Sequence, residues 1–273
     1  MISVLMPAYN SETYIYSAIE SVLNQSYDNF ELIIVNDGST DNTKDIILSF
    51  KDDRIKYFEN EQNRGLTYTR NKLLSLSKGN YIAFLDSDDI AHQDRFKTQI
   101  HLIENQNYDF VAASSQYIDA NNSKLNNKQI FNLNKDEILA TMLYFNPIIT
   151  STVLFKKSIL HNLNFREAYP PCEDYDLWQR LLLNCKAIVI PQILVKYRIH
   201  NSNISTVMNK QSKLNRNKVT LNHFHHYFYQ YINNSFDNQH LQLVDFTLIN
   251  NTNTVSDYVN KLITINKDRN FFP

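Results

Sequence analysis

The amino-acid sequence predicts an α/β fold, with a mostly parallel central sheet flanked by helices. Two observations lead to this prediction. In residues 1–120, short apolar runs typical of strands alternate with segments whose apolar residues recur at helical spacing. Such alternation is typical of a doubly wound parallel sheet. Several apolar runs also stop abruptly at polar side chains, as strands do at the ligand-binding edge of such a sheet.

The expected elements of the first half follow one another regularly. Strands are expected at residues 2–6, 31–35, 55–58, 81–85 and 110–118, and helices at 11–25, 40–50, 66–77 and 94–105. Asn10 or Ser11 is the expected cap of the first helix. Residues 36–39 form a turn signal, and Gly79 marks the end of the third helix.

The pattern is less regular after residue 120. We expect a loop or short hairpin at 120–135, helices at 136–144 and 174–183, and a strand at 152–155. Two short strands, 187–190 and 194–199, are expected on either side of Pro191. From about residue 205 the chain is polar, rich in asparagine and helical in pattern, with an aromatic cluster at 223–231. We therefore divide it into a domain at 1–205 and a C-terminal helical region at 206–273.

Composition excludes several classes of protein. The 273 residues carry a net charge of -1, so no polycationic surface points to nucleic acid. There is no run of 18 apolar residues and no basic leader at the N-terminus, so neither a membrane span nor a secretion signal is expected. Two cysteines and three glycines exclude a disulfide framework and a glycine-rich phosphate loop. These features favour a cytoplasmic protein.

An acidic turn follows the expected strand at 81–85. Asp86, Ser87, Asp88 and Asp89 come directly after an apolar run. Clustered carboxylates repel one another, so a cation is expected beside them. A divalent ion with oxygen ligands suits the site and leaves positions for substrate phosphates. The alternative is a polar turn whose aspartates cap the helix that begins at about residue 92.

Three strand ends are expected to meet at one edge of the sheet. The first strand leads into Pro7, Ala8 and Tyr9, the second into Asp37, and the fourth into the acidic turn. This combination suits a nucleoside diphosphate. Tyr9 can face a base, and Asp37 can accept a hydrogen bond from a ring N–H such as the uracil imide. The alternative for Asp37 is a structural role in an Asx-turn before glycine.

The sequence also resembles the family 2 glycosyltransferases of the GT-A fold over about residues 1–205. The resemblance lies in the following motifs, which occur in family order: Pro7-Ala8-Tyr9-Asn10, Asn36-Asp37-Gly38-Ser39-Thr40-Asp41, Asn63-Arg64-Gly65 with Arg70-Asn71, Leu85-Asp86-Ser87-Asp88-Asp89, Asn146-Pro147, Glu173-Asp174-Tyr175-Asp176-Leu177-Trp178 and Val195-Lys196-Tyr197-Arg198-Ile199-His200. The Asn-Pro and last motifs look closest to bacterial β-1,3-N-acetylhexosaminyl- and galactosyltransferases of lipopolysaccharide outer cores. Those enzymes usually continue with His-Asn-Asn, whereas this chain has Ile148-Ile149-Thr150, which leaves the sugar and the acceptor open.

The resemblance implies a role for each matching residue. Tyr9 and Asp37 contact the uracil of a UDP-sugar and Arg70 braces the nucleotide, while Asp86 and Asp88 flank Mn²⁺ or Mg²⁺. Asp174 is the base that deprotonates the acceptor hydroxyl. The full nucleotide-binding set that it implies is Pro7, Ala8, Tyr9, Asp37, Asn63, Arg70, Asp86 and Ser87, and the metal set is Asp86, Asp88 and His200.

The expected chemistry agrees with these roles. Transfer from UDP needs a stabilised leaving group, which a metal provides, and a hydroxyl activated by a carboxylate. A single displacement puts Asp174 opposite the leaving group, so configuration inverts. The alternative for Glu173 and Asp174 is N-terminal capping of a helix, whose dipole would also favour their ionised form. Trp178 is expected in the core rather than under the acceptor.

The sequence is also compatible with two other functions, and it indicates the partners to expect. The alternatives are a non-catalytic sugar-nucleotide-binding module and a nucleotidyltransferase. The expected partners are a UDP-sugar donor and a saccharide or lipid-linked glycan acceptor, in lipooligosaccharide, capsule or other surface-glycan assembly. Basic residues at 210–218 before the aromatic cluster suggest peripheral contact with the inner face of the membrane, with a packed helix as the alternative. The sequence does not indicate the oligomeric state.

Overall fold

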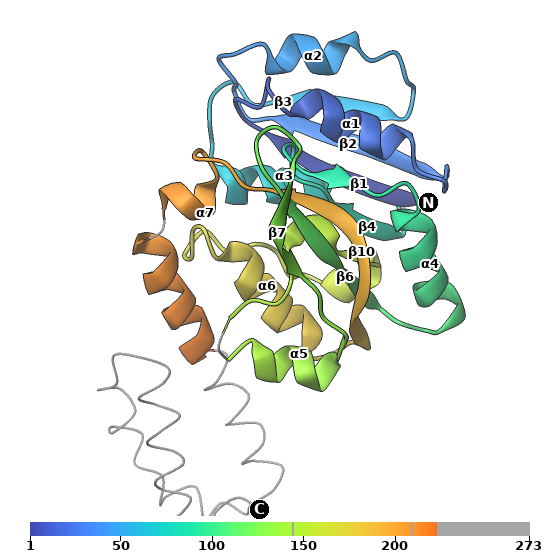
Figure 1. Cartoon of the computed structure of the whole chain (residues 1–273), viewed down its shortest axis with the longest axis vertical. Coiled ribbons are helices and arrows are strands. Elements are labelled where there is room, and N and C mark those ends of the chain that lie inside the picture. The colour runs from blue at the N-terminus through green and yellow to red at the C-terminus, as the bar shows by residue number, and fades with distance from the viewer. Residues whose placement is uncertain (144, 209, 223–273) are drawn as a thin grey trace, which may run out of the picture.

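A computed structural model describes residues 1–143, 145–208 and 210–222 of the chain. Its centre is one large sheet with helices on both faces (Figure 1). The strand order along the sheet is β3-β2-β1-β4-β9-β6-β10-β5, with β7 paired to β6 and β8 paired to β10. The predicted α/β class with a central sheet flanked by helices is therefore confirmed.

The N-terminal half of the sheet is the parallel part. It consists of β1 (Ile2–Ala8), β2 (Phe30–Asn36), β3 (Ile55–Glu59) and β4 (Tyr81–Phe84), connected by α1 (Ile15–Leu23), α2 (Thr43–Ser49) and α3 (Leu66–Leu76). β1 pairs in parallel with both β2 and β4, and β2 pairs in parallel with β3. Because these strands run the same way, their carboxyl ends lie at one edge of the sheet.

The second half of the sheet is mixed. After β5 (Ile90–Ala91) and α4 (Arg95–Asn105) come β6 (Phe110–Ile118), β7 (Lys124–Gln129), β8 (Leu133–Asn134) and α5 (Lys135–Thr141). A short turn, η1 (Thr150–Thr152), leads into β9 (Leu154–Lys156) and the turn η2 (Lys157–Leu160); α6 (Glu173–Leu182), β10 (Ala187–Arg198) and α7 (Ile204–Val207) follow. β9 runs antiparallel between β4 and β6, so β6 and β10 again run in the direction of β4. A strand was expected at 152–155, but the sequence did not predict that it would run in the reverse direction.

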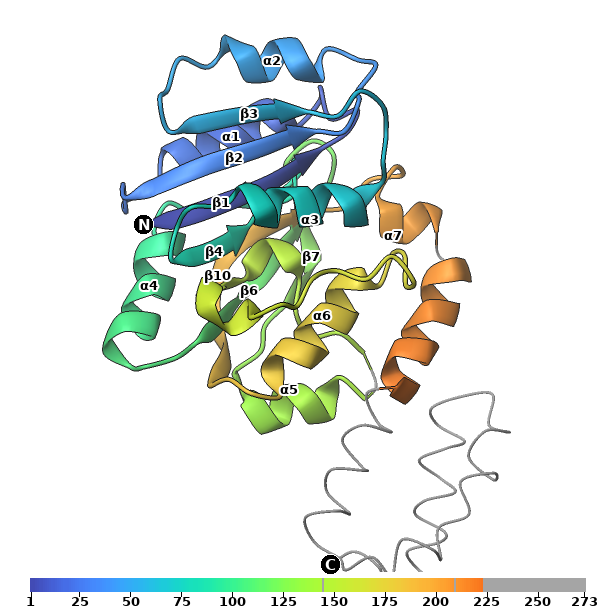
Figure 2. The same cartoon turned by 180° about the vertical axis from the view of Figure 1, so that it is seen from behind.

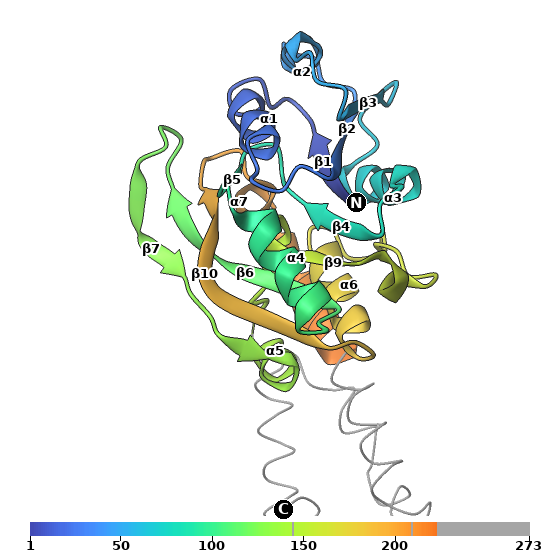
Figure 3. The ribbon, with the colours of Figure 1, turned by 90° about the vertical axis from the view of Figure 1, so that its right-hand side faces the viewer.

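Two hydrophobic cores lie on the two faces of the sheet. Along β1, alternate residues Ile2, Val4 and Met6 pack with α1 and α4, whereas Leu5 faces the other core with α3, α5 and α6. Figure 2 shows α3 and α6 on the face away from α1, and in the turned view of Figure 3 α1 and α3 lie on opposite sides of β1 and β2. Buried side chains on both faces explain why the strands read as continuous apolar runs.

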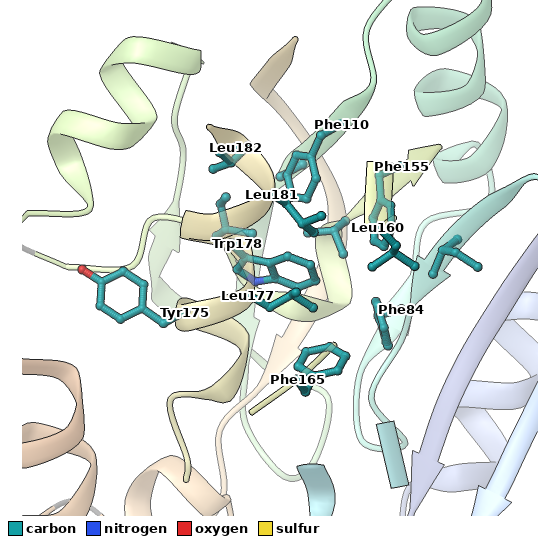
Figure 4. Close-up of a cluster of buried hydrophobic side chains, with 14 of the residues drawn as sticks. Phe84, Phe110, Phe155, Leu160, Phe165, Tyr175, Leu177, Trp178, Leu181 and Leu182 are labelled. Atoms are coloured by element: carbon teal, nitrogen blue, oxygen red, sulfur yellow. The ribbon is translucent and has the colours of Figure 1, made fainter. Parts of the chain in front are cut away.

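Trp178 lies at the centre of the second core. It is fully buried and contacts Phe84, Phe110, Phe155 and Phe165 edge-on, with ring centroids 5.6–6.1 Å apart (Figure 4). Aromatic pairs prefer such T-shaped arrangements because the positive ring edge meets the negative face. The expectation that this residue is part of the core is confirmed.

Several expected element boundaries were wrong. α1 begins at Ile15 rather than at residue 11, after a turn in which Asn10 has a φ of 46°. The two strands expected around Pro191 form one strand, β10, whose register against β6 shifts between Ile190 and Ile193. A bulge tolerates proline, which has no N–H to give to the ladder.

The C-terminal helical region is only partly described. Residues 210–222 are helical, and Asn215 and Thr220 contact Pro170 and Tyr175 near the start of α6. The aromatic cluster at 223–231 lies outside the described residues, as does the rest of the chain to residue 273. The domain boundary at residue 205 remains a prediction. Within the described ranges, no helix combines the length and the apolar character needed to cross a membrane.

Candidate active site

The strand ends that were expected to converge lie together at the carboxyl edge of the parallel sheet. Pro7 and Ala8 are the last residues of β1 and are buried, whereas Tyr9 directly after them is 46% exposed. The Asp37 N–H, after β2, donates to the Ala8 carbonyl at 2.8 Å. β4 leads into the acidic turn on the other side of β1. The sheet therefore places an exposed ring, a buried acid and three further carboxylates at one edge.

Asp37 organises the loop that follows β3. Its carboxylate accepts hydrogen bonds from the Asn60 side chain at 2.7 Å and from the backbone N–H groups of Arg64 and Gly65, both at 2.9 Å. Asn63 lies in this loop, and its side chain accepts from the Gly65 N–H. The sequence alternatives for Asp37 were a base contact and a local turn. The structure shows a third role, because the three donors come from a different loop.

The carboxylates of the acidic turn point toward different partners. Asp86 accepts from the Arg70 guanidinium at 3.2 Å, and Asp88 lies 2.9 Å from Nε2 of His200. The Ser87 hydroxyl is 2.8 Å from that of Ser11. Burial raises the pKa of Asp86, and Arg70 partly offsets this effect. Since α4 begins only at Arg95 with Asp94 at its N-cap position, the turn is not the cap of that helix.

Asp89 is the fully buried carboxylate of the acidic turn. Its Oδ1 accepts from the backbone N–H of Arg198 at 2.8 Å. Burial raises the pKa of its carboxyl well above the ordinary value, and the charges of Asp88 and Asp86 act in the same direction. Asp89 therefore connects the turn to the end of β10 and does not point into the site.

His200 is held in place from both sides of its ring. Its Nδ1 is 2.7 Å from the Ser202 hydroxyl, while Nε2 points to Asp88. The ring of Tyr14 packs against it, with centroids 4.9 Å apart. Asp88 and His200 are 112 positions apart in sequence, and β10 is the element that brings them together.

Arg198 is a site residue to which the sequence analysis gave no role. Its guanidinium donates to the carbonyls of Asp88 at 2.7 Å and Asp119 at 3.0 Å and to the Asn122 side chain at 2.7 Å. It also stacks on the Tyr14 ring, 4.6 Å from the centroid. Arg198 thus joins the acidic turn to the loop after β6. The feature of the sequence that could have indicated this role is its position two residues before His200.

Arg70 connects the acidic turn to the start of α6. Besides Asp86, its guanidinium bonds Glu173 at 2.8 Å, and all three side chains are largely buried. Burial alone would lower the pKa of Arg70, but Asp86, Glu173 and Asp174 outweigh it, so the pKa is raised. Burial raises the pKa of Glu173 despite the nearby Arg70. Removing one member of such a buried network leaves an uncompensated charge and is strongly destabilising.

Asp174 follows Glu173 in the first turn of α6. One oxygen, Oδ1, accepts from the N–H of Tyr175 at 2.6 Å, and Oδ2 accepts from the Thr150 hydroxyl at 2.8 Å. Thr150 lies in η1, and its neighbour Ser151 accepts from the backbone N–H of Asp86 at 3.0 Å. Asp174 is therefore on the same side of the molecule as the acidic turn, to which both Arg70 and η1 connect it.

The donor atoms for a metal are limited. In the described part of the chain, no three histidine, cysteine, aspartate or glutamate side chains are grouped closely enough to hold an ion. Asp88 and His200 nevertheless offer an oxygen and a nitrogen 2.9 Å apart, and the Ser202 contact to the other ring nitrogen is typical of a metal-binding histidine. Mg²⁺ is commonly held by one or two carboxylates together with substrate phosphates, so a two-ligand site fits.

Comparison with known proteins shows the family of the chain. The family model described as Glycosyl transferase family 2 matches residues 3–163. The chain is 36% identical over 228 residues to the Escherichia coli UDP-Glc:alpha-D-GlcNAc-diphosphoundecaprenol beta-1,3-glucosyltransferase WfgD, covering 82% of this chain and 86% of that one.

Solved structures share the fold at lower sequence identity. S. aureus TarS 1-349 in complex with UDP-GlcNAc superposes with a TM-score of 0.65 at 20% identity, over 82% of this chain and 72% of that one. A mannosyltransferase from Pyrobaculum calidifontis in complex with GDP-Man and Mn2+ gives 0.60 at 15% identity, over 83% and 64%. The sequence resemblance and the predicted GT-A fold are thus confirmed. The chain belongs to glycosyl transferase family 2 and is a glycosyltransferase.

Proposed function

We propose that this enzyme transfers a hexose or N-acetylhexosamine from a UDP-sugar to a saccharide hydroxyl, with inversion and with the help of Mn²⁺ or Mg²⁺. The observation that carries the proposal is the connection of three distant segments at one sheet edge: Asp88 with His200, and Asp86 through Arg70 with Glu173 beside Asp174. The activity named for the E. coli relative supports a UDP-hexose donor and a lipid-linked GlcNAc acceptor.

The nucleotide occupies the edge formed by β1, β2 and the acidic turn in this proposal. Pro7 and Ala8 form the floor, Tyr9 faces the uracil, and Ser87 and Asn63 border the diphosphate and the base. Asp37 retains acceptor capacity for the uracil imide, because a carboxylate has about four lone-pair sites and three donors contact it here. Arg70 braces the nucleotide from below through Asp86.

Asp88 and His200 hold the divalent ion in this proposal, with Asp86 beside them as a further carboxylate. Bound there, the ion would act as a Lewis acid on the diphosphate leaving group. The chain's own contribution is to fix both ligands before substrate arrives: Arg198 holds the backbone of Asp88, and Ser202 holds the ring of His200.

Asp174 takes the proton from the acceptor hydroxyl in this proposal. It lies in the first turn of α6, where the Tyr175 N–H and the Thr150 hydroxyl hold its carboxylate. A base on the opposite side of the anomeric carbon from the diphosphate gives a single displacement and hence inversion. Glu173 forms an ion pair with Arg70. In this proposal it helps to orient the Asp174 carboxylate and does not itself react.

A donor screen tests the proposal. The protein is incubated with each common UDP-sugar in Mn²⁺, in Mg²⁺ and in excess EDTA, and UDP release and thermal shift are measured. We expect UDP release that depends on the metal and that is lost in Asp88→Ala. Asp174→Asn should bind UDP normally but not transfer the sugar. Asp53→Ala, a change at an exposed acid before β3, is the matched control. Full activity of Asp88→Ala or in EDTA would exclude the metal site, and turnover of Asp174→Asn within a few fold would exclude the base.

We also propose that the enzyme works at the inner face of the membrane during surface-glycan assembly. The support is a lipid-linked acceptor in the E. coli relative and a segment in which Val207 and Leu214 are 69% and 51% exposed and Lys210 and Lys213 are exposed as well. Basic and apolar side chains together bind anionic interfaces. Co-sedimentation with vesicles containing phosphatidylglycerol, but not with neutral vesicles, is the expected result, and its absence would contradict this part.

A further inference from the structure

The turn η1 contacts both halves of the site through two adjacent hydroxyls. Ser151 accepts the Asp86 N–H at 3.0 Å, at the start of the acidic turn, and Thr150 donates to Oδ2 of Asp174 at 2.8 Å. Both residues are buried, with Thr150 4% exposed and Ser151 fully enclosed. A single short turn therefore links the metal side of the proposed site to the proposed base.

The turn itself is firmly anchored. Gln99 of α4 donates to the carbonyl of Thr152 at 2.8 Å, and Arg95 donates to that of Val153 at 2.9 Å. Both α4 side chains are fully buried, and Thr152 closes the turn by donating to the Ile149 carbonyl at 2.7 Å. Because packed interiors transmit displacement rather than absorb it, η1 can act as a fixed spacer.

The Asp174 carboxylate is oriented by one contact on each oxygen. The Tyr175 N–H on Oδ1 belongs to the same helix and cannot by itself set the side chain relative to the acidic turn. The Thr150 hydroxyl on Oδ2 comes from a different element. Each oxygen keeps a lone pair free after these contacts, so the carboxylate can still accept a proton.

From this geometry we infer that Thr150 is a positioning residue: its hydroxyl holds the Asp174 carboxylate at a fixed distance from the acidic turn. The inference rests on the proposed role of Asp174. It gives a function to one residue of the stretch Ile148-Ile149-Thr150, where the chain departs from the His-Asn-Asn of the enzymes it otherwise resembles.

The test compares Thr150→Val, which removes the hydroxyl at nearly constant volume, with Thr150→Ser, which keeps it. Thr152→Val is the matched control, because it removes a buried hydroxyl of the same turn that bonds the Ile149 carbonyl. UDP release is measured with the most active UDP-sugar of the donor screen, and UDP affinity is measured by calorimetry. We expect Thr150→Val to lower kcat about 10- to 100-fold, as small misplacements of catalytic groups do, with UDP affinity unchanged.

Two further results are expected. Thr150→Ser should restore kcat to within a few fold, and Thr150→Val combined with Asp174→Asn should be no slower than Asp174→Asn alone, since Thr150 acts through that carboxylate. If Thr150→Val fails to fold, Thr150→Ala takes its place. A kcat of Thr150→Val within about threefold of the wild type, a loss equal to that of Thr152→Val, or an unrescued Thr150→Ser overturns the inference. Active Asp174→Asn instead contradicts the proposed base, so the two failures are distinguishable.

Discussion

Replacing Arg198 with methionine tests whether this buried guanidinium holds the site together. Its three shortest bonds go to the Asp88 carbonyl, the Asp119 carbonyl and the Asn122 side chain, at 2.7, 3.0 and 2.7 Å. The side chain is 1% exposed and also stacks on Tyr14 at 4.6 Å. Solvent screening therefore weakens these contacts little.

The expected loss follows from these contacts. At about 1 kcal/mol for each of the three hydrogen bonds and about 1 kcal/mol for the ring contact, Arg198→Met lowers the free energy of unfolding by about 4 kcal/mol. Methionine refills most of the space of the apolar stem, so a cavity contributes little. The disturbed Asp88 backbone should also reduce turnover if this residue holds a metal as proposed.

Arg54 provides the matched control. It bonds Asp52 at 2.7 Å and lies 4.6 Å from the centroid of the Phe30 ring, much as Arg198 lies over Tyr14, but its side chain is 32% exposed. Arg54→Met should therefore lower the free energy of unfolding by only about 1 kcal/mol. The two variants thus compare a buried guanidinium with a partly exposed one, each of which also stacks on an aromatic ring.

Urea denaturation followed by Trp178 fluorescence measures both losses. Trp178 is the single tryptophan of the chain and is fully buried, so its emission reports on the core. A loss for Arg198→Met below about 1 kcal/mol, or equal to that of Arg54→Met, would refute the reasoning, because buried and exposed guanidinium contacts would then count alike.

The other predictions concern the base contact, pH and the thiols. UDP should shift the melting temperature more than CDP, and Asp37→Asn should abolish the difference; equal shifts in the wild type would contradict the uracil contact. Burial alone would raise the pKa of Asp109, but bonds from Lys156 and from backbone lower it overall. The pKa of Asp109 is therefore lower in the folded than in the unfolded state. Its ionised carboxylate stabilises the fold above the unfolded-state pKa, and this stabilisation is lost as the pH falls through the folded-state pKa. Asp109→Asn should therefore cost about 1 kcal/mol of stability at pH 7, and the difference between wild type and variant should close as the pH falls through the folded-state pKa; a difference independent of pH would disprove this. Burial raises the pKa of Cys172 to about 11 and of Cys185 to about 12, so both should react with Ellman's reagent at pH 8 about 100-fold more slowly than in urea; a fast-reacting thiol in the native protein would count against their burial.

The sequence predicts the parallel half of the fold well because its information is local. The runs that became β1, β2 and β4 are continuous and apolar, and the polar residues after each run mark the functional edge directly. The position of β9 could not be predicted. It lies antiparallel between β4 and β6, and nothing in residues 154–156 specifies either neighbour.

The sequence indicated which side chains would lie near one another better than it indicated the contacts that they make. Asp88 and His200 were both expected near a metal, and the structure places them 2.9 Å apart. The partners of Asp37 were not foreseen, since the pairing depends on a loop 23–28 positions away. Arg198 and Thr150 were missed for a different reason: an arginine in a strand or a threonine in a turn has a structural use in most proteins.

The contact between Asp88 and His200 has a consequence for enzyme engineering. The family match ends at residue 163, ahead of Asp174, of β10 and of the histidine. A chimera that exchanged only the matched segment with a relative would combine one parent's acidic turn with the other parent's Asp174 and His200. Crossover points for altering sugar preference therefore belong after residue 203, so that each parent keeps its own set of connected side chains.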